Sequence, residues 1–312
     1  MLRNSSFRHE FRRQLPLHLF VWAGLLFLLL FCLIPMTGIV IAFKDYNIRD
    51  GFGGMFTAPW TGQFGMKHFI SFMTNRKFGT LVRNTVVISS LKLFFAFPFA
   101  IVFAIMVTEL RNQGYKRLVQ TASYLPHFVS WTVVAGIVYA MFSTNIGVIN
   151  ELLIKLHLRS DPIPLLIDAD YYYFLAVASE IWKETGWSAI IYLAAIAGID
   201  PSLYESAQVD GAGRLRRIWH ITLPGISGTI SVLLILAVGD LFTGSFDQAM
   251  MLGNDMNISR SEIMDVFIYQ TGLSKQRYSY AAAAGLFQSV ICFALVMIAN
   301  AGSKKISGAS LF

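Results

Sequence analysis

The chain has 312 residues, of which 55% are hydrophobic and only 14% are charged. Soluble domains carry about 25% charged residues, so this composition, together with several long apolar runs, excludes an ordinary soluble protein and predicts a chain that lies in a lipid bilayer. Its two cysteines, Cys32 and Cys292, each lie inside an apolar run, so the sequence offers no disulfide framework and no metal-binding cysteine pattern.

The N-terminus combines a basic segment with a long apolar stretch. Four arginines within residues 1–16 precede the run Leu17–Phe43. A secretory signal has an apolar core of about 7–15 residues followed by a small-residue cleavage site, whereas this run is longer and no such site follows it. We therefore expect a retained first membrane helix.

Six segments are long and apolar enough to cross a bilayer, which needs roughly 20 residues. They are Leu17–Phe43, Asn84–Thr108, Val119–Phe142, Tyr172–Ile199, Ile226–Thr243 and Ala281–Ala301. The predicted fold class is thus an all-α integral membrane protein with six transmembrane helices. Residues 44–83 form an extracytoplasmic segment after the first helix, residues 84–301 a core of five helices with a long loop at 200–225, and residues 302–312 a tail.

The charges of the loops predict the orientation. The two terminal segments and the loops Glu109–Leu118 and Asp200–Gly225 hold twelve Lys/Arg and five Asp/Glu, whereas the opposite loops hold eleven and ten. Because basic residues stay on the cytoplasmic side, both termini are expected in the cytoplasm. The net charge of +7 is then a property of the topology, and no nucleic-acid partner is expected.

The loop at 200–225 has the chemistry of two short helices joined by a turn. Asp200 suits an N-cap and Pro201 the first helical position, so a helix is expected over Leu203–Val209. Asp210-Gly211 breaks it because glycine tolerates positive φ. Three apolar side chains then fall on one face of a second helix, which Pro224 is expected to end: Leu215, Ile218 and Trp219. The pattern alone fits either an interfacial helix on lipid or a docking element.

The exact residues favour the docking element. The run Glu205-Ser-Ala207-x-x-Asp210-Gly211-Ala212, followed by Ile221-Thr-Leu223-Pro224, resembles the EAA loop of ABC importer permeases, with Ser206 where the family usually has alanine. The resemblance implies that the loop docks in a groove of a nucleotide-binding subunit, with Glu205 at the contact and Gly211 at the turn. The implied ATPase-coupling residues are Tyr204, Glu205, Ala207, Asp210, Gly211, Ala212, Leu215 and Trp219.

Most of the rest of the chain resembles the oligosaccharide permeases of the carbohydrate-uptake group. The stretches that carry this likeness are Asn84-Thr85, Phe97-Pro98, Glu109-Leu110-Arg111, Gln120–Trp131 and Ala299-Asn300, and they match the branch with lipo-oligosaccharide-type and alginate-type permeases. The resemblance implies a type I ABC importer permease fold in the bacterial cytoplasmic (inner) membrane. Its implied partners are a second homologous permease subunit, two ATP-binding subunits, an extracytoplasmic solute-binding protein, membrane lipid and a carbohydrate.

The sequence contains no G-x-x-x-x-G-K-[ST] phosphate loop and no H-E-x-x-H motif. We therefore expect no enzymatic activity, no catalytic residue, no metal site and no cofactor in this chain, with ATP and Mg²⁺ bound by the partner ATPase.

Charged residues inside a span suggest a transport pathway, since they are costly in lipid. Four residues of the fourth span recur at helical spacing on one stripe, and Asp240 is a further candidate in the fifth span. The stripe consists of Glu180, Lys183, Glu184 and Trp187. Polar groups beside an aromatic face suit a sugar, whereas a structural Glu–Lys pair is the competing explanation.

Three further polar residues are predicted to have structural roles. Lys92 in the second span is expected to snorkel or pair internally, with contact to the substrate as the alternative. His127 and His220 have no partners at metal-ligand spacing and are expected to be structural. Two glutamates would repel a polyanion such as alginate unless cations outweigh them, so neutral oligosaccharides remain open.

Two other classes of function remain as alternatives. An ion-coupled secondary sugar carrier would show inverted repeats, and no internal repeat is evident. A membrane enzyme could use Glu180 and Glu184 as paired carboxylates, although they lie one turn apart on one helix instead of flanking a bond.

Overall fold

The computed structural model describes residues 14–243 and 245–307, and the predictions for residues 1–13 and 308–312 lie outside the described residues. Helices make up the secondary structure of the described ranges, with one isolated bridge between Lys44 and Trp60 in place of any strand. The chain divides into two units. Of the described residues, the first unit comprises 14–73 and 271–286, and the second comprises 74–243, 245–270 and 287–307.

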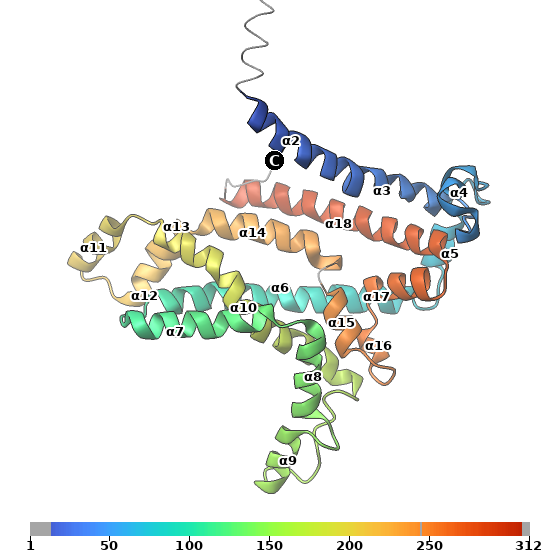
Figure 1. Ribbon diagram of the computed structural model, residues 1–312. Coiled ribbons are helices and arrows are strands. Elements are labelled where there is room, and N and C mark those ends of the chain that lie inside the picture. Colours follow the sequence, from blue (N-terminus) through green and yellow to red (C-terminus); the bar gives the residue numbers. More distant parts are fainter. Residues whose placement is uncertain (1–13, 244, 308–312) are drawn as a thin grey trace, which may run out of the picture. The chain divides into compact units, whose positions relative to one another are not determined.

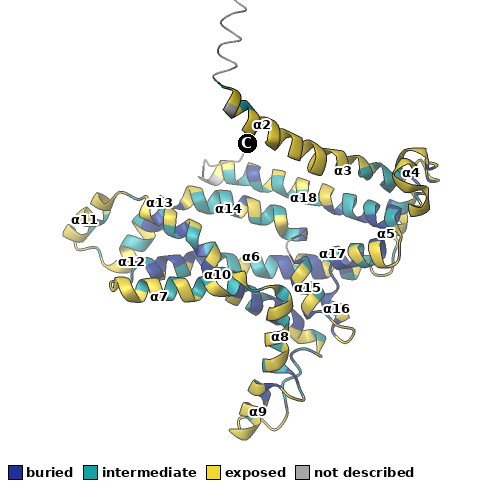
Figure 2. Ribbon diagram, viewed as in Figure 1, coloured by how far each residue is buried: buried dark blue, intermediate teal, exposed yellow. Residues whose placement is uncertain are grey.

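The first unit begins with an apolar helical rod over Leu17–Phe43. The rod comprises α2 (Leu15–Leu28), a π turn (Leu29–Leu33), α3 (Ile34–Met36) and a 3₁₀ segment (Thr37–Phe43). The π turn ends two residues before Pro35, as expected where a proline removes a helical hydrogen bond. Exposed apolar side chains cover α2 along its length (Figure 2), and a helix that is apolar all round fits a lipid environment.

The remainder of the first unit is a set of short helices: a 3₁₀ turn (Ile48–Asp50), α4 (Gly51–Thr57), α5 (Lys67–Met73) and the start of α18 (Tyr278–Ser307). Phe72 is fully buried, and its ring packs edge-on against Tyr280. The backbone N–H of Tyr46 donates to Ser279 Oγ at 3.0 Å. These contacts fasten the segment after the first helix to the start of the last one.

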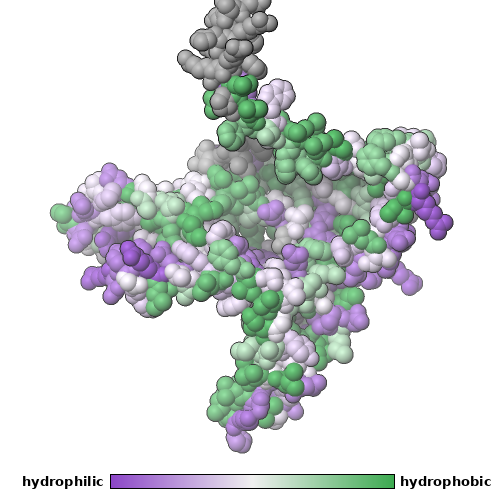
Figure 3. All heavy atoms as spheres, viewed as in Figure 1, coloured by the Kyte–Doolittle hydropathy of each residue, from purple (hydrophilic) through white to green (hydrophobic). Residues whose placement is uncertain are grey.

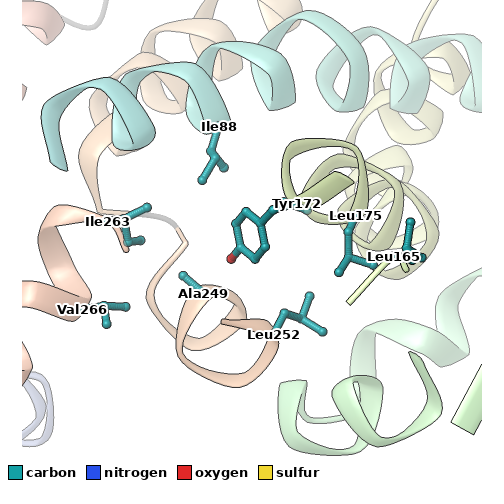
Figure 4. Close-up of a cluster of buried hydrophobic side chains, with 9 residues drawn as sticks. Ile88, Leu165, Tyr172, Leu175, Ala249, Leu252, Ile263 and Val266 are labelled. Carbon is teal, nitrogen blue, oxygen red and sulfur yellow. The ribbon is translucent and has the colours of Figure 1, made fainter. Parts of the chain in front are cut away.

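The second unit is built around α6 (Phe78–Thr108) and α10 (Tyr172–Ala197), which pack along each other (Figure 1). Small residues allow the close approach: Ala100, Ala104 and Ala189 are all buried. A second cluster surrounds the buried ring of Tyr172 at the start of α10 (Figure 4). Its other members come from α6, α10 itself, α15 (Phe246–Leu252), α17 (Met264–Tyr269) and the loops before α10 and α17.

The predicted third span, Val119–Phe142, is not one straight helix. The chain forms α7 (Gln113–Tyr124), a 3₁₀ turn (Leu125–Phe128) and α8 (Trp131–Phe142), and the two helical parts meet at 103°. Pro126 lies in the turn, and Ser130 caps α8 by accepting the N–H of Val133. Pro126 is therefore not accommodated within one continuous helix, because a new N-cap follows it and starts a second helix.

The segment after α8 forms an arm that projects from the α6–α10 pair and includes α9 (Val148–Lys155) (Figure 1). Buried Asn150 holds the arm together. Its Nδ2 donates to the carbonyls of Phe142, Ser143 and Ile163, and its Oδ1 accepts the N–H of Ile163. The side chain of Asn150 thereby connects α9 to the end of α8 and to the loop at Ile163.

After α10 come α11 (Pro201–Val209), α12 (Arg214–Arg217), a π turn (Ile218–Thr222), α13 (Leu223–Gly225) and α14 (Ser227–Gly239), which ends in a 3₁₀ turn (Asp240–Phe242). Then follow α15, α16 (Ile258–Ser261), α17, a π turn (Gln270–Ser274) and the last part of α18.

Three described helices are long and apolar enough to span a bilayer on their own: Leu17–Phe43, Phe78–Thr108 and Tyr278–Lys305. Three bent pairs raise the number to six if each pair counts as one span. The second predicted helix begins six residues earlier than expected, at Phe78, because residues 78–83 continue the same helix.

Candidate functional site

Polar side chains gather around a cavity of about 350 Å³ in the second unit. The cavity lies among α6, α10 and the end of α14. Its charged lining residues are Lys92, Glu180, Glu184 and Asp240, and its neutral polar ones include Ser89, Ser188, Tyr192 and Ser245. Polar groups of several helices in an otherwise apolar bundle are the usual setting of a small-molecule site.

An ion pair between two helices forms one wall of the cavity. Lys92 Nζ of α6 lies 2.9 Å from Glu180 Oε2 of α10 and 2.8 Å from Ser245 Oγ. The two charged side chains are only 13% and 20% exposed. Each charge is therefore compensated by the other, as a mostly buried charge requires.

A second cluster connects α10 to the bend between α7 and α8. Lys183 Nζ donates to Glu184 Oε1 at 2.7 Å and to the carbonyl of His127 at 2.8 Å. Glu184 Oε2 lies 2.6 Å from His127 Nδ1. The ring of His127 stacks on Trp187 with a centroid distance of 4.3 Å and an interplanar angle of 1°. Glu184 is thus held in place by two partners while it lines the cavity.

The structure brings together part of the predicted pathway stripe. Glu180, Glu184 and Asp240 line the cavity. Within the described ranges, the carboxylate of Asp240 accepts no hydrogen bond and forms no ion pair. Lys183 and Trp187 do not line it: Lys183 is buried over the ring of Trp131, and Trp187 packs on His127.

Sequence reasoning gave too small a role to two residues. Lys92 does pair internally, as expected, but it also lines the cavity. His127 is structural in the sense that it orients Glu184. Its only signal in the sequence was its place in the Gln120–Trp131 stretch.

The predicted coupling loop forms a helix–turn–helix at one end of the second unit. Asp200 caps α11 by accepting the N–H of Ser202, with Pro201 at the first helical position. Gly211 makes the turn with φ of +73° and has open space around it. Tyr204 Oη and Thr222 Oγ1, 3.0 Å apart, join the two halves of the loop.

The second half of the loop differs from the expectation at Pro224. The helical stretch does not end there, because α12 continues through a π turn into α13, and the chain bends by 63° only before α14. The π turn ends two residues before Pro224. Pro224 has no N–H to donate within the helix, and the change in hydrogen-bond pattern at the π turn allows the helix to continue past it.

Most of the predicted coupling residues lie at the surface. Tyr204, Ala207 and Ala212 are half-buried, and the remaining five are exposed: Glu205, Asp210, Gly211, Leu215 and Trp219. Hydrophilic surface gathers at the end of the unit that carries α11 and α12, with apolar side chains between (Figure 3).

Comparisons with known proteins agree with this geometry. Residues 69–308 match the family model described as binding-protein-dependent transport system inner membrane component. The chain is 43% identical over 310 residues to Protein LplB of Bacillus subtilis (strain 168), covering 99% of this chain and 95% of the relative. It is 41% identical to the polygalacturonan/rhamnogalacturonan transport system permease protein YteP of the same strain, covering 94% and 89%.

The fold recurs in a solved transporter. A chain in the crystal structure of a bacterial ABC transporter involved in the import of the acidic polysaccharide alginate superposes with a TM-score of 0.86 at 35% identity, covering 97% of this chain and 99% of that one. The same agreement holds for the alginate transporter in complex with an alginate pentasaccharide-bound periplasmic protein. The chain therefore belongs to the inner-membrane components of binding-protein-dependent transport systems, as a permease of the sugar-importing ABC group.

Proposed function

We propose that this chain forms half of a saccharide pathway through the inner membrane and couples to a separate ATPase through residues 200–225. The other half would come from a second homologous permease subunit. Two ATP-binding subunits would supply ATP and Mg²⁺, and an extracytoplasmic solute-binding protein would deliver the substrate. Six spans with both termini in the cytoplasm fit the loop charges and the three long helices with three bent pairs.

The observation that carries this proposal is the outward apolar surface of the loop. Leu203, Val209, Leu215 and Trp219 are 52%, 89%, 73% and 67% exposed. Large apolar side chains that face outward beside charged ones are typical of a protein-binding surface. Since Gly211 has free space around it, its conformation serves the shape of the loop and not internal packing.

A substitution at Gly211 tests the coupling role. Gly211→Trp needs a positive φ that costs a bulky residue about 1–2 kcal/mol, and it places an indole on the docking surface. We expect the variant to insert normally and the reconstituted importer to hydrolyse ATP with little uptake. Gly211→Asn is the matched control, because asparagine tolerates this φ. Uptake at the wild-type rate by a well-expressed Gly211→Trp variant would contradict the proposal.

The cavity is the proposed substrate pathway within this subunit, with Glu180, Glu184 and Asp240 as its acidic wall. Asp240 is the best probe, because its carboxylate lines the cavity without holding a helix in place. Asp240→Asn should lower uptake while leaving the amount of assembled importer unchanged, and Asp240→Ala should lower it further. Equal uptake by all three proteins would remove Asp240 from the pathway.

The charges of this half favour a neutral saccharide over a uronate polymer. Three carboxylates line the cavity, and two of them are paired, Glu180 with Lys92 and Glu184 with Lys183. This leaves Asp240 as the uncompensated charge and, among the described residues that line the cavity, no free cation for a polyanion. A chain of the alginate importer has a similar structure, and alginate is an acidic polysaccharide. If the substrate here were also a polyanion, the compensating cations would have to come from the partner permease. The family is one of transport permeases, which favours neither the ion-coupled carrier nor the membrane enzyme.

A further inference from the structure

A second and larger cavity, of about 840 Å³, lies beside the coupling loop. It is lined by the C-terminal ends of α6 and α10, the start of α7, and α11 and α12. Tyr204 and Glu205 of the coupling loop face it. Its volume lies within the range of about 300–1,000 Å³ usual for ligand pockets.

Basic side chains dominate the charge of this cavity. Four cations line it against two carboxylates, Glu109 and Glu205, and the cations are Arg111, Lys116, Arg214 and Arg217. The ion pair between Arg214 Nε and Glu109 Oε2 is long, at 3.8 Å. In the part of the chain that the structure describes, the other three cations have no carboxylate within ion-pair distance.

Arg217 gives the cavity an unsatisfied donor. Its Nε is out of contact with solvent and has no hydrogen-bond partner among the described residues. An N–H withdrawn from water without an acceptor is costly. Convergent, unpaired cations repel one another, and a bound anion would remove both costs.

We propose that this cavity binds a phosphate ester from the cytoplasmic side, which rests on the proposed topology. Guanidinium groups recognise phosphate oxygens by paired hydrogen bonds. Neutral polar groups suit the hydroxyls of the esterified part: Thr108, Gln120, Tyr204, Gln208 and Thr222 all line the cavity. Inorganic phosphate alone would leave most of the volume empty.

Binding here would affect coupling. A phosphate ester between α11 and the ends of α6 and α10 would hold the coupling loop against the bundle. Because ATP-driven motion has to displace this loop in the proposed mechanism, the ligand would slow uptake. An imported sugar that is phosphorylated in the cell yields a ligand of this class, so accumulated product would restrain further import.

The test uses the complete importer, co-purified with its partner subunits and placed in nanodiscs of phosphatidylcholine. Glucose 6-phosphate, as the probe, is titrated and its binding measured by calorimetry, with glucose as the uncharged control. We expect saturable binding of the phosphate ester only, weakened at least tenfold by Arg217→Gln. Arg216→Gln is the matched control, because Arg216 lies next to Arg217 but is exposed and does not line the cavity. Lys116→Gln gives a second test if Arg217→Gln does not assemble.

Nanodiscs that contain phosphatidylglycerol distinguish the two sources of the phosphate. If phosphatidylglycerol stays bound to the wild type but not to Arg217→Gln when the importer is extracted from these discs into detergent, and the sugar phosphate does not bind, the ligand is a lipid headgroup and the site stands. If neither phosphate ester binds, or if Arg216→Gln weakens binding as much as Arg217→Gln, the site is refuted and the cations serve membrane topology alone. Uptake and ATP hydrolysis without added phosphate ester test the proposed function separately.

Discussion

The contact between Gly186 of α10 and Ser123 of α7 gives a sharp test of how the site is positioned. A Cβ atom added to Gly186 would lie 2.1 Å from the carbonyl oxygen of Ser123 and 2.4 Å from its carbonyl carbon. The obstacle is backbone, which cannot rotate away as a side chain can. In Gly186→Ala the two helices would have to separate by roughly 1 Å to restore van der Waals distances.

Overpacking of this kind costs about 1–3 kcal/mol, and the rigidity of both backbones places Gly186→Ala near the upper end. At about 2 °C per kcal/mol for a chain of this size, the thermal midpoint should fall by about 5 °C. The same separation affects the site, because His127 follows Ser123 by one turn and Glu184 precedes Gly186 by two residues. The 2.6 Å contact between Nδ1 of His127 and Oε2 of Glu184 should then lengthen, with a loss of uptake.

The assay is size-exclusion chromatography of the detergent-solubilised importer after heating, together with uptake in proteoliposomes. Gly136→Ala in α8 is the matched control, since a Cβ there meets nothing within 4 Å and alanine favours a helix by about 0.5–1 kcal/mol. We expect this control to be as stable as the wild type or slightly more stable. A Gly186→Ala midpoint within 1 °C of the wild type would refute the argument that the two helices touch at Gly186.

Three further predictions concern individual side chains. Lys92→Met leaves the Glu180 carboxylate mostly buried without its partner and should destabilise the bundle by about 2 kcal/mol. The double variant that adds Glu180→Gln should recover most of this stability. Equal thermal midpoints for the single variant and the wild type would contradict the prediction. Burial raises the pKa of Asp265, outside the candidate spans, above its ordinary value. The unfolded chain therefore releases this proton at a lower pH than the folded chain, and the stability of the wild type falls as pH rises through the folded pKa. The thermal midpoint of Asp265→Asn, measured relative to the wild type, should therefore rise with pH. A difference between the two midpoints that stays constant with pH would count against this. Asn150→Leu leaves several buried backbone groups of the arm without a hydrogen-bond partner and should lower the stability of the arm by about 3 kcal/mol. The loss should be seen as faster proteolysis of residues 131–168. Unchanged cleavage there would show that Asn150 does not hold the arm.

Much of the helical arrangement could be predicted because apolar length is a local signal. The fourth predicted helix, Tyr172–Ile199, differs from α10 by two residues at its end. The capped start and glycine turn of the coupling loop also depend on local chemistry. The bend between α7 and α8 could not be read so easily, since Pro126 alone fits a tolerated kink as well as a true break.

The site was harder to predict because its geometry depends on partners far away in the sequence. The i, i+3, i+4, i+7 spacing placed Glu180 and Lys183 on one stripe, yet the two side chains have different partners. Glu180 meets Lys92, 88 positions away, and Lys183 meets the backbone of His127, 56 positions away. Helical spacing predicts direction, but only the packing decides which residue faces the cavity.

The helix α10 gives the coupling loop a direct mechanical connection to the cavity. From Glu184 to Asp200 the chain rises by about 24 Å at 1.5 Å per residue, almost all of it within α10. Over this length α10 packs through Ala189 against Ala100 and Ala104 of α6, so closely that the two helices have to move together. The chain bends by 71° between α10 and α11, so residues 198–200 have to transmit a displacement of the loop to α10. A displacement that reaches α10 would move Glu184 and, through His127, the bend between α7 and α8, and it would thereby alter both the acidic wall of the cavity and the position of the arm.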